Sequence, residues 1–229
     1  AHGLRWQIPA EREKMLEIYR NVCRLHEVIA DQEMVSHAFL SEDRAVQRST
    51  FADGTVATVN FGDAPHAVAD AGVSRDAVVL RRDDFVVRGP RVEQWRLSSA
   101  SEPSRIETYI RTATCLFADF GGAAFDVPAA RGHGQLWVTL AAEDQARLML
   151  GPGSRADLDL AAWQPSWRGL PVAVFETDAA GQPTRRIEPH ADGRLTLAAP
   201  ADAKALLLAL VGAAADRKST RLNSSHGKL

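Results

Sequence analysis

Apolar and polar side chains alternate along two neighbouring segments, residues 46–51 and 55–61. A period of two places successive side chains on opposite faces of a strand, so each segment is predicted to be a β-strand. Between them, Asp53 and Gly54 suit a tight turn, because glycine accepts positive φ and aspartate bonds its own backbone nearby. The pattern therefore predicts a β-hairpin.

A helical period precedes this hairpin, from about residue 10 to about residue 33. Pro9 suits the first turn of a helix, where its missing N–H has no partner to lose. Apolar side chains then recur at helical spacing on a wide stripe that contains Met15, Leu16, Ile18, Tyr19, Val22, Cys23, Leu25, His26, Ile29 and Ala30. The width of the stripe predicts a helix that is buried on more than one side, as between a barrel and a second domain.

The rest of the chain contains short strand-like runs separated by turn residues. They cover 78–80, 85–87, 92–97, 106–113, 116–120, 135–140, 146–150, 158–160, 171–176, 184–187, 195–197 and 206–211. Such spacing is typical of an antiparallel β-sandwich. A helix over 201–215 is the alternative, since alanine and leucine favour helix, but a sandwich needs its last strand. The polar run 98–104 is predicted to be a linker.

Composition and charge narrow the classes of partner. The 229 residues carry a net charge of −2, so no global field recruits nucleic acid or an anionic membrane. No apolar run approaches the roughly 20 residues of a membrane helix. Cys23 and Cys115 form neither a metal-binding spacing nor a disulfide framework. The expected partners therefore include neither nucleic acid nor a membrane, and localisation is left open.

Both ends of the chain have unusual sequences. Ala1 is not an initiator residue, and we expect that residues are missing before it, so no targeting signal is readable. At the other end, DRKSTRLNSSH (216–226) resembles the translation of a common short-read sequencing adapter. Residues 216–229 are therefore interpreted as an artefactual tail, with a natural disordered tail as the alternative. Much alanine and arginine with few lysines indicates a GC-rich bacterial gene.

Residues 26–63, HEVIADQEMVSHAFLSEDRAVQRSTFADGTVATVNFGD, resemble the region that follows the catalytic barrel in glycoside hydrolases of families 101 and 129. Residues 85–89, FVVRG, are similar to a later strand of the same region. The resemblance implies a parent enzyme that cleaves α-linked N-acetylgalactosamine or a related sugar. It also implies that the two catalytic carboxylates lie upstream, at the ends of barrel strands. No catalytic residue and no cofactor are therefore expected in this chain.

Together these patterns predict a mainly β fold, in which an N-terminal helix precedes two antiparallel β-sandwich-like domains. Residues 1–34 are assigned to the end of a truncated barrel, 35–100 to a β domain packed on it, and 104–214 to an immunoglobulin-like sandwich. The main hypothesis is a non-catalytic accessory region of a glycosidase, whose partner is the missing upstream barrel. The alternatives are a carbohydrate-binding module and a cell-surface interaction sandwich without a sugar role.

Two groups of side chains carry candidate chemistry. Trp163 and Trp167 flank a loop-like stretch and are the candidate sugar-stacking platform, with burial in the core as the alternative. His26, Glu33 and His37 have spacings that suit a metal pair or a general base, although a polar cluster at the helix end explains them as well. The turn residues Asp43, Asp53 and Asp63 are explained by Asx-turns, with calcium as a weaker reading. No metal site is therefore assigned.

Overall fold

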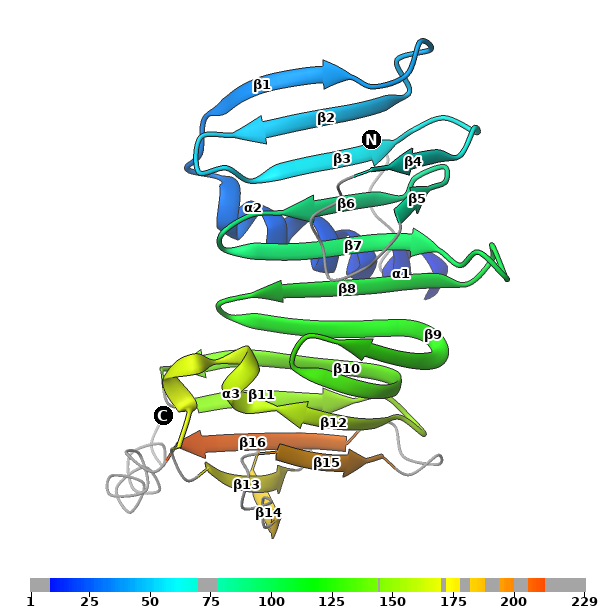
Figure 1. The fold of residues 1–229 in the computed structure, drawn as a ribbon. Coiled ribbons are helices and arrows are strands. Elements are labelled where there is room, and N and C mark those ends of the chain that lie inside the picture. Colours follow the sequence, from blue (N-terminus) through cyan, green and yellow to red (C-terminus); the bar gives the residue numbers. More distant parts are fainter. Residues whose placement is uncertain are drawn as a thin grey trace, which may run out of the picture.

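The computed structural model describes residues 9–69, 78–143, 145–169, 172–177, 182–187, 194–199 and 206–212. The fold is mainly β, with one helical segment at the N-terminal end of the described chain (Figure 1). The predicted fold class is thus confirmed. None of the helices in the described ranges is both long and apolar enough to cross a bilayer.

The helical segment comprises α1 (Pro9–Ile18), a π-helical stretch η1 (Tyr19–Cys23) and α2 (Arg24–Ile29). It ends before the predicted residue 33, because the chain enters strand β1 (Met34–Phe39). The sequence pattern did not predict β1. This strand pairs antiparallel with β2 (Val46–Phe51), and the backbone N–H of Ala52 donates to the carbonyl of Glu33 at 2.9 Å.

The predicted hairpin is confirmed by β2 and β3 (Val56–Asn60). Gly54 has a φ of 87°, which an L side chain rarely adopts. The Asp53 carboxylate accepts a hydrogen bond from the backbone N–H of Thr55 at 2.9 Å. The two turn residues, Asp53 and Gly54, therefore fix the register of the hairpin, and both could be recognised in the sequence.

The remaining elements continue the antiparallel pattern. They are β4 (His66–Val68), β5 (Val78–Leu80), β6 (Phe85–Arg88), β7 (Val92–Ser98), β8 (Ile106–Thr112), β9 (Cys115–Val127), β10 (Ala130–Ala142), β11 (Gln145–Leu150), β12 (Arg155–Asp159), α3 (Leu160–Trp163), η2 (Pro165–Trp167), β13 (Val172–Thr177), β14 (Pro183–Ile187), β15 (Arg194–Ala198) and β16 (Leu206–Gly212). The main sheet runs in the order β1-β2-β3-β6-β7-β8-β9-β10-β11-β16-β13-β14. The strand expected at 206–211 is β16, so the helical alternative is wrong.

The segment predicted as a linker connects two paired strands. β7 and β8 pair antiparallel from Val92 with Thr112 to Ser98 with Ile106. Residues 98–104 therefore form the connection of a hairpin, and the sheet continues without a break from one side of it to the other. A polar, proline-bearing loop at a hairpin end has the same composition as a linker, which is why the sequence pattern did not separate the two.

A sandwich forms where β9 and β10 fold back over the main sheet. β9 bends at Gly121 and Gly122, with φ of 60° and 81°, and β10 bends at Gly134, with φ of 80°. Strand β9 had been predicted to end at the first of these glycines, but it continues to Val127. Beyond the bends, 124–127 pair with 130–133, and β12 and β15 extend this second layer.

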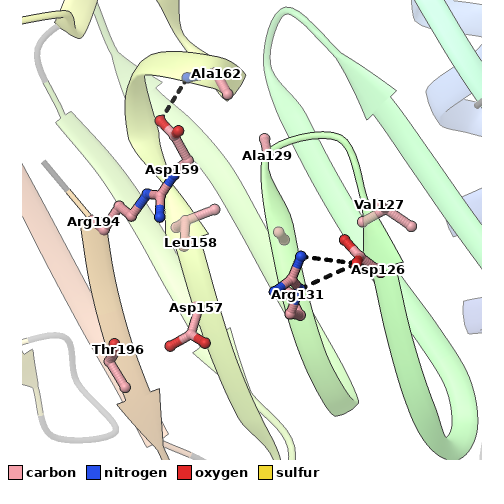
Figure 2. A pocket seen from close by; sticks show the side chains of 11 residues that line it. Asp126, Val127, Ala129, Arg131, Asp157, Leu158, Asp159, Ala162, Arg194 and Thr196 are labelled. Atoms are coloured by element: carbon pink, nitrogen blue, oxygen red, sulfur yellow. Dashed lines mark hydrogen bonds and ion pairs between the residues drawn. The ribbon is translucent and has the colours of Figure 1, made fainter.

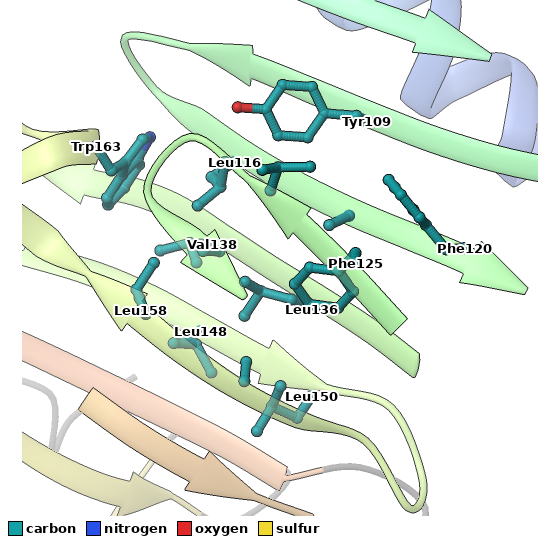
Figure 3. Packing of buried hydrophobic residues seen from close by; sticks show 14 of the residues in the cluster. Tyr109, Leu116, Phe120, Phe125, Leu136, Val138, Leu148, Leu150, Leu158 and Trp163 are labelled. Carbon is teal, nitrogen blue, oxygen red and sulfur yellow. The ribbon is translucent and has the colours of Figure 1, made fainter. Parts of the chain in front are cut away.

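The main hydrophobic core lies between the two layers and continues beneath the small β4–β5 sheet. Figure 3 shows part of it, where Leu116, Leu136 and Val138 of the main sheet lie close to Phe125 and Leu158 of the second layer. Trp95 and Tyr109 extend the same core on the same face of the main sheet, with ring centroids 4.3 Å apart. The helical segment lies on the opposite face.

Some predictions fall outside the described residues. They are the hairpin turn at 178–181, the turn at 192–193 and the interpretation of the 216–229 tail. The strand predicted at 158–160 was placed too late, because β12 ends at Asp159 and Leu160 already belongs to α3. The Asp159 carboxylate caps that short helix by accepting the backbone N–H of Ala162 at 2.9 Å.

Candidate functional site

The two tryptophans predicted to stack on sugar are buried. Trp163 and Trp167 are each only 4% exposed and belong to the main core. Their rings meet edge to face with centroids 6.4 Å apart. A stacking platform needs an open ring face, and neither indole has one, so these two residues do not form the predicted platform.

The tryptophans instead anchor the connection between β12 and β13. The indole N–H of Trp167 donates to the carbonyl of Glu143 at 2.9 Å. Trp163 lies beside Leu116 and Leu158 in the core (Figure 3). Their burial fixes α3 and η2 against the sandwich, which is the core role that the sequence left open as an alternative.

The candidate cluster of His26, Glu33 and His37 does not gather into a site. His37 Nδ1 lies 3.1 Å from the hydroxyl of Ser49, and its ring meets Phe39 edge to face. His26 and Glu33 are exposed on and after α2. Among the described residues, no group of three or more His, Cys, Asp or Glu side chains is arranged to hold a metal ion.

The turn aspartates have structural partners. The Asp43 carboxylate accepts the hydroxyl of Ser41 at 2.5 Å and the N–H of Ala45 at 3.0 Å, and these hydrogen bonds lower its pKa. Asp63 forms an exposed ion pair with Arg82 at 2.7 Å. Asx-turns are thus confirmed for Asp43 and Asp53, while Asp63 is held by a charge partner that spacing did not indicate.

Sequence reasoning missed a buried polar junction beside the hairpin. Asn60, fully buried, donates to the carbonyls of Ala64 and Leu80 and accepts the N–H of Gly62. Asp84, also fully buried, accepts from the Ser98 hydroxyl and N–H and from a further backbone N–H. These side chains satisfy turn backbone and expose no reactive group. Only the pairing of β3, β6 and β7 brings them together.

The helix contacts the sheet through both polar and apolar groups. The Gln94 amide donates to the carbonyl of Asn21 at 2.9 Å, and Arg96 forms an ion pair with Glu17 at 2.7 Å. The guanidinium of Arg20 lies over the Phe117 ring, 5.3 Å from its centroid. The apolar part of this contact comprises two clusters. One contains Leu25, Val28, Ile29, Ala57, Phe85, Val87 and Val92, and the other contains Ile110, Cys115, Phe117 and Trp137 of the sheet.

The helix also exposes apolar side chains. Ile18, Tyr19 and Val22 are exposed, with Val22 at 56%. Strand β1 adds exposed Met34, Val35 and Phe39, and its second edge pairs with no other strand of the described chain. We call these six residues, three on the helix and three on the two faces of β1, the apolar surface. Large side chains left in water on a helix and on a sheet edge are typical of a surface that another body covers.

A second candidate lies on the outer face of the second layer. Its pocket, with a volume of about 450 Å³, is lined by Asp126, Val127, Ala129, Ala130, Arg131, Asp157, Leu158, Asp159, Ala162, Arg194 and Thr196 (Figure 2). Strand pairing aligns Asp126 with Arg131, Arg131 with Asp157, and Asp157 with Thr196. We call this row, with the cross-strand pair Asp159–Arg194, the polar cleft.

The polar cleft has both donors and acceptors. Arg131 holds Asp126 through an ion pair at 3.0 Å. Asp157 has no hydrogen bond or ion pair within the described part of the chain, and in Figure 2 its carboxylate lies beside Thr196. No sequence pattern indicates this cleft, because its members come from four strands that meet only after β9 and β10 bend.

Compared with known protein families, with curated proteins and with solved structures, the chain matches none.

Proposed function

We propose that this chain is the C-terminal accessory β region of a glycoside hydrolase, and that it supports the catalytic barrel without being catalytic itself. The proposal joins the resemblance of residues 26–63 to post-barrel sequences with one observation, the exposed apolar surface. A helix that packs on its own sheet with one side and exposes Ile18, Tyr19 and Val22 on the other suits a position between two bodies.

The physical basis is the free energy of covering that surface. Burial of a large aliphatic or aromatic side chain contributes about 1.5–3 kcal/mol. Three such side chains on the helix and three on β1 therefore favour association strongly, while the sheet behind them is stabilised by a separate core. In this role the β region would fix the last barrel helix.

The first test concerns the gene. The coding sequence directly upstream is expected to encode a barrel with two carboxylates at the C-terminal ends of its strands. The 229-residue chain alone is expected to give no turnover of aryl α-glycosides. Turnover by this chain, or an upstream sequence without such a barrel, would contradict the proposal.

The second test concerns the apolar surface. The upstream barrel, expressed as a separate chain, is expected to co-elute with the β region in size-exclusion chromatography. Val22→Glu should abolish co-elution, because it places a charge among the exposed apolar side chains of the helix. Val79→Glu is the matched control, since Val79 is 42% exposed on β5 and lies outside the apolar surface. Equal binding of both variants would reject this surface as the interface.

A further inference from the structure

The polar cleft has a chemistry that the accessory role does not explain. Its row crosses the second layer from β9 through β10 and β12 to β15, with neighbouring strands about 4.8 Å apart. Along it, carboxylate, guanidinium, carboxylate and hydroxyl follow one another as Asp126, Arg131, Asp157 and Thr196. Donors and acceptors therefore alternate at the spacing of a sheet.

The walls of the cleft are fixed by the fold. On one side lies the β9–β10 turn, where Ala129 has a φ of 73°. On the other side lies α3, capped by Asp159 and anchored through the buried Trp163. Trp163, one of the two candidate sugar-stacking residues, thus helps to hold one wall of a different depression.

The charges of the lining select among ligands. Three aspartates and two arginines leave the cleft close to neutral, which disfavours an anion such as a phosphate beside the unpaired Asp157. Arginines among the carboxylates disfavour a bare divalent cation, in line with the absence of a metal-binding group in the described residues. A neutral molecule with several hydroxyls fits, because each hydroxyl donates to a carboxylate and accepts from a guanidinium.

We propose that the polar cleft binds a neutral, hydroxyl-rich small molecule of the hexose class, with Asp157 accepting two hydroxyl hydrogen bonds and Thr196 and Arg131 completing the contacts. The proposed role of the cleft is binding, with Asp126 and Asp157 on a water-exposed sheet face. None of the described residues that line the cleft is aromatic, so the expected dissociation constants are millimolar.

The test uses the full chain and saturation-transfer NMR with D-galactose, D-glucose and N-acetyl-D-galactosamine. Galactose 1-phosphate is the anionic probe in the same experiment, and calcium chloride, followed by isothermal titration calorimetry, is the cationic probe. At least one neutral sugar is expected to bind, and Asp157→Asn should weaken it about tenfold, as expected for the loss of a charge-assisted acceptor. Thr196→Ala should weaken it less. Asp83→Asn is the matched control, because Asp83 is exposed in a distant turn with a φ of 63°, which asparagine tolerates.

Three outcomes would overturn the inference: no transfer from any neutral sugar, equal affinity of wild type and Asp157→Asn, or binding of the charged probes alone. Circular dichroism of each variant shows that loss of binding is not loss of fold. The inference does not depend on the apolar surface. Sugar binding without barrel association would support this inference and refute the proposed function. Barrel association without sugar binding would refute this inference and leave the proposed function standing.

Discussion

The two faces of the main sheet are covered in different ways. On one face, the second layer and the β4–β5 sheet enclose a continuous apolar core that includes the fully buried Trp95, Tyr109 and Leu136. On the other face, the helix is held by hydrogen bonds and ion pairs around two small apolar clusters. Apolar burial is the dominant favourable term in folding, so the first face stabilises this chain by itself.

The difference indicates what each face is for. Exposed ion pairs contribute only about 0.2–1 kcal/mol each, whereas burying one leucine contributes about 1.5–3 kcal/mol. The ion pairs of the helix therefore add little to the apolar clusters beneath it. A helix whose outer side is also apolar gains further stability when a partner covers that side.

The largest expected effect comes from the core face. Leu136→Ala should lower the free energy of unfolding by about 2–5 kcal/mol, because it removes a fully buried side chain and leaves a cavity. Urea unfolding followed by tryptophan fluorescence measures it. Val79→Ala, at an exposed position, should stay within about 0.5 kcal/mol of wild type. Equal effects of the two variants would mean that the enclosed core does not dominate stability.

An intermediate effect is expected from Cys115, which lies beneath the helix with Phe117 and Trp137. Burial raises the pKa of this thiol from 9.0 to about 11. The folded state keeps it neutral while the unfolded state ionises, so its contribution is complete below pH 9 and is lost as pH rises towards 11. Stability should fall by about 2 kcal/mol over that window.

The variant Cys115→Ala separates the pH-dependent stability that comes from the Cys115 thiol from the part that comes from Tyr109, because burial also raises the pKa of the Tyr109 phenol. Unfolding free energies measured at pH 8 and pH 11 should differ less in the variant than in wild type. Exposed Cys23 offers an internal comparison, because iodoacetamide at pH 8 should label it long before Cys115. Equal labelling rates would show that the helix leaves the sheet uncovered.

The smallest expected effect concerns the helix contacts themselves. Glu17→Gln weakens the ion pair with Arg96 and should cost less than about 1 kcal/mol, since the Glu17 side chain is half exposed. Hydrogen exchange of the η1 and α2 amides should nevertheless accelerate. Glu42→Gln, at an exposed turn, is the control and should leave exchange unchanged. An equal acceleration in both variants would show that the ion pair between Glu17 and Arg96 does not hold the helix against the sheet.

Much of the fold could be predicted because it depends on local patterns. The hairpin at Asp53 and Gly54 has its turn residues beside its alternating strands, and most strand positions were read in the same way. β1 was missed because its sequence, MVSHAF, has apolar side chains on both faces and no alternation. Both faces of β1 are exposed, so burial against a core does not require apolar and polar residues to alternate along it.

The candidate sites were predicted less well, because they depend on contacts that are distant in the sequence. The sequence shows that Trp163 and Trp167 flank a loop, but their burial follows from the second layer that covers them. That layer requires bends at Gly121, Gly122 and Gly134, and glycines in strands were read as strand ends. The polar cleft exists only after those bends, so no spacing along the chain could indicate it.

The strands β9 and β10, which both layers share, determine how the sandwich unfolds. Each belongs to both layers of the sandwich, with its two halves paired in different layers. Neither layer can separate while the other keeps its interstrand hydrogen bonds, because β9 and β10 are paired in both layers. Under heat or mechanical pulling, the sandwich should therefore rupture as one unit, with a single sharp transition and no half-open form.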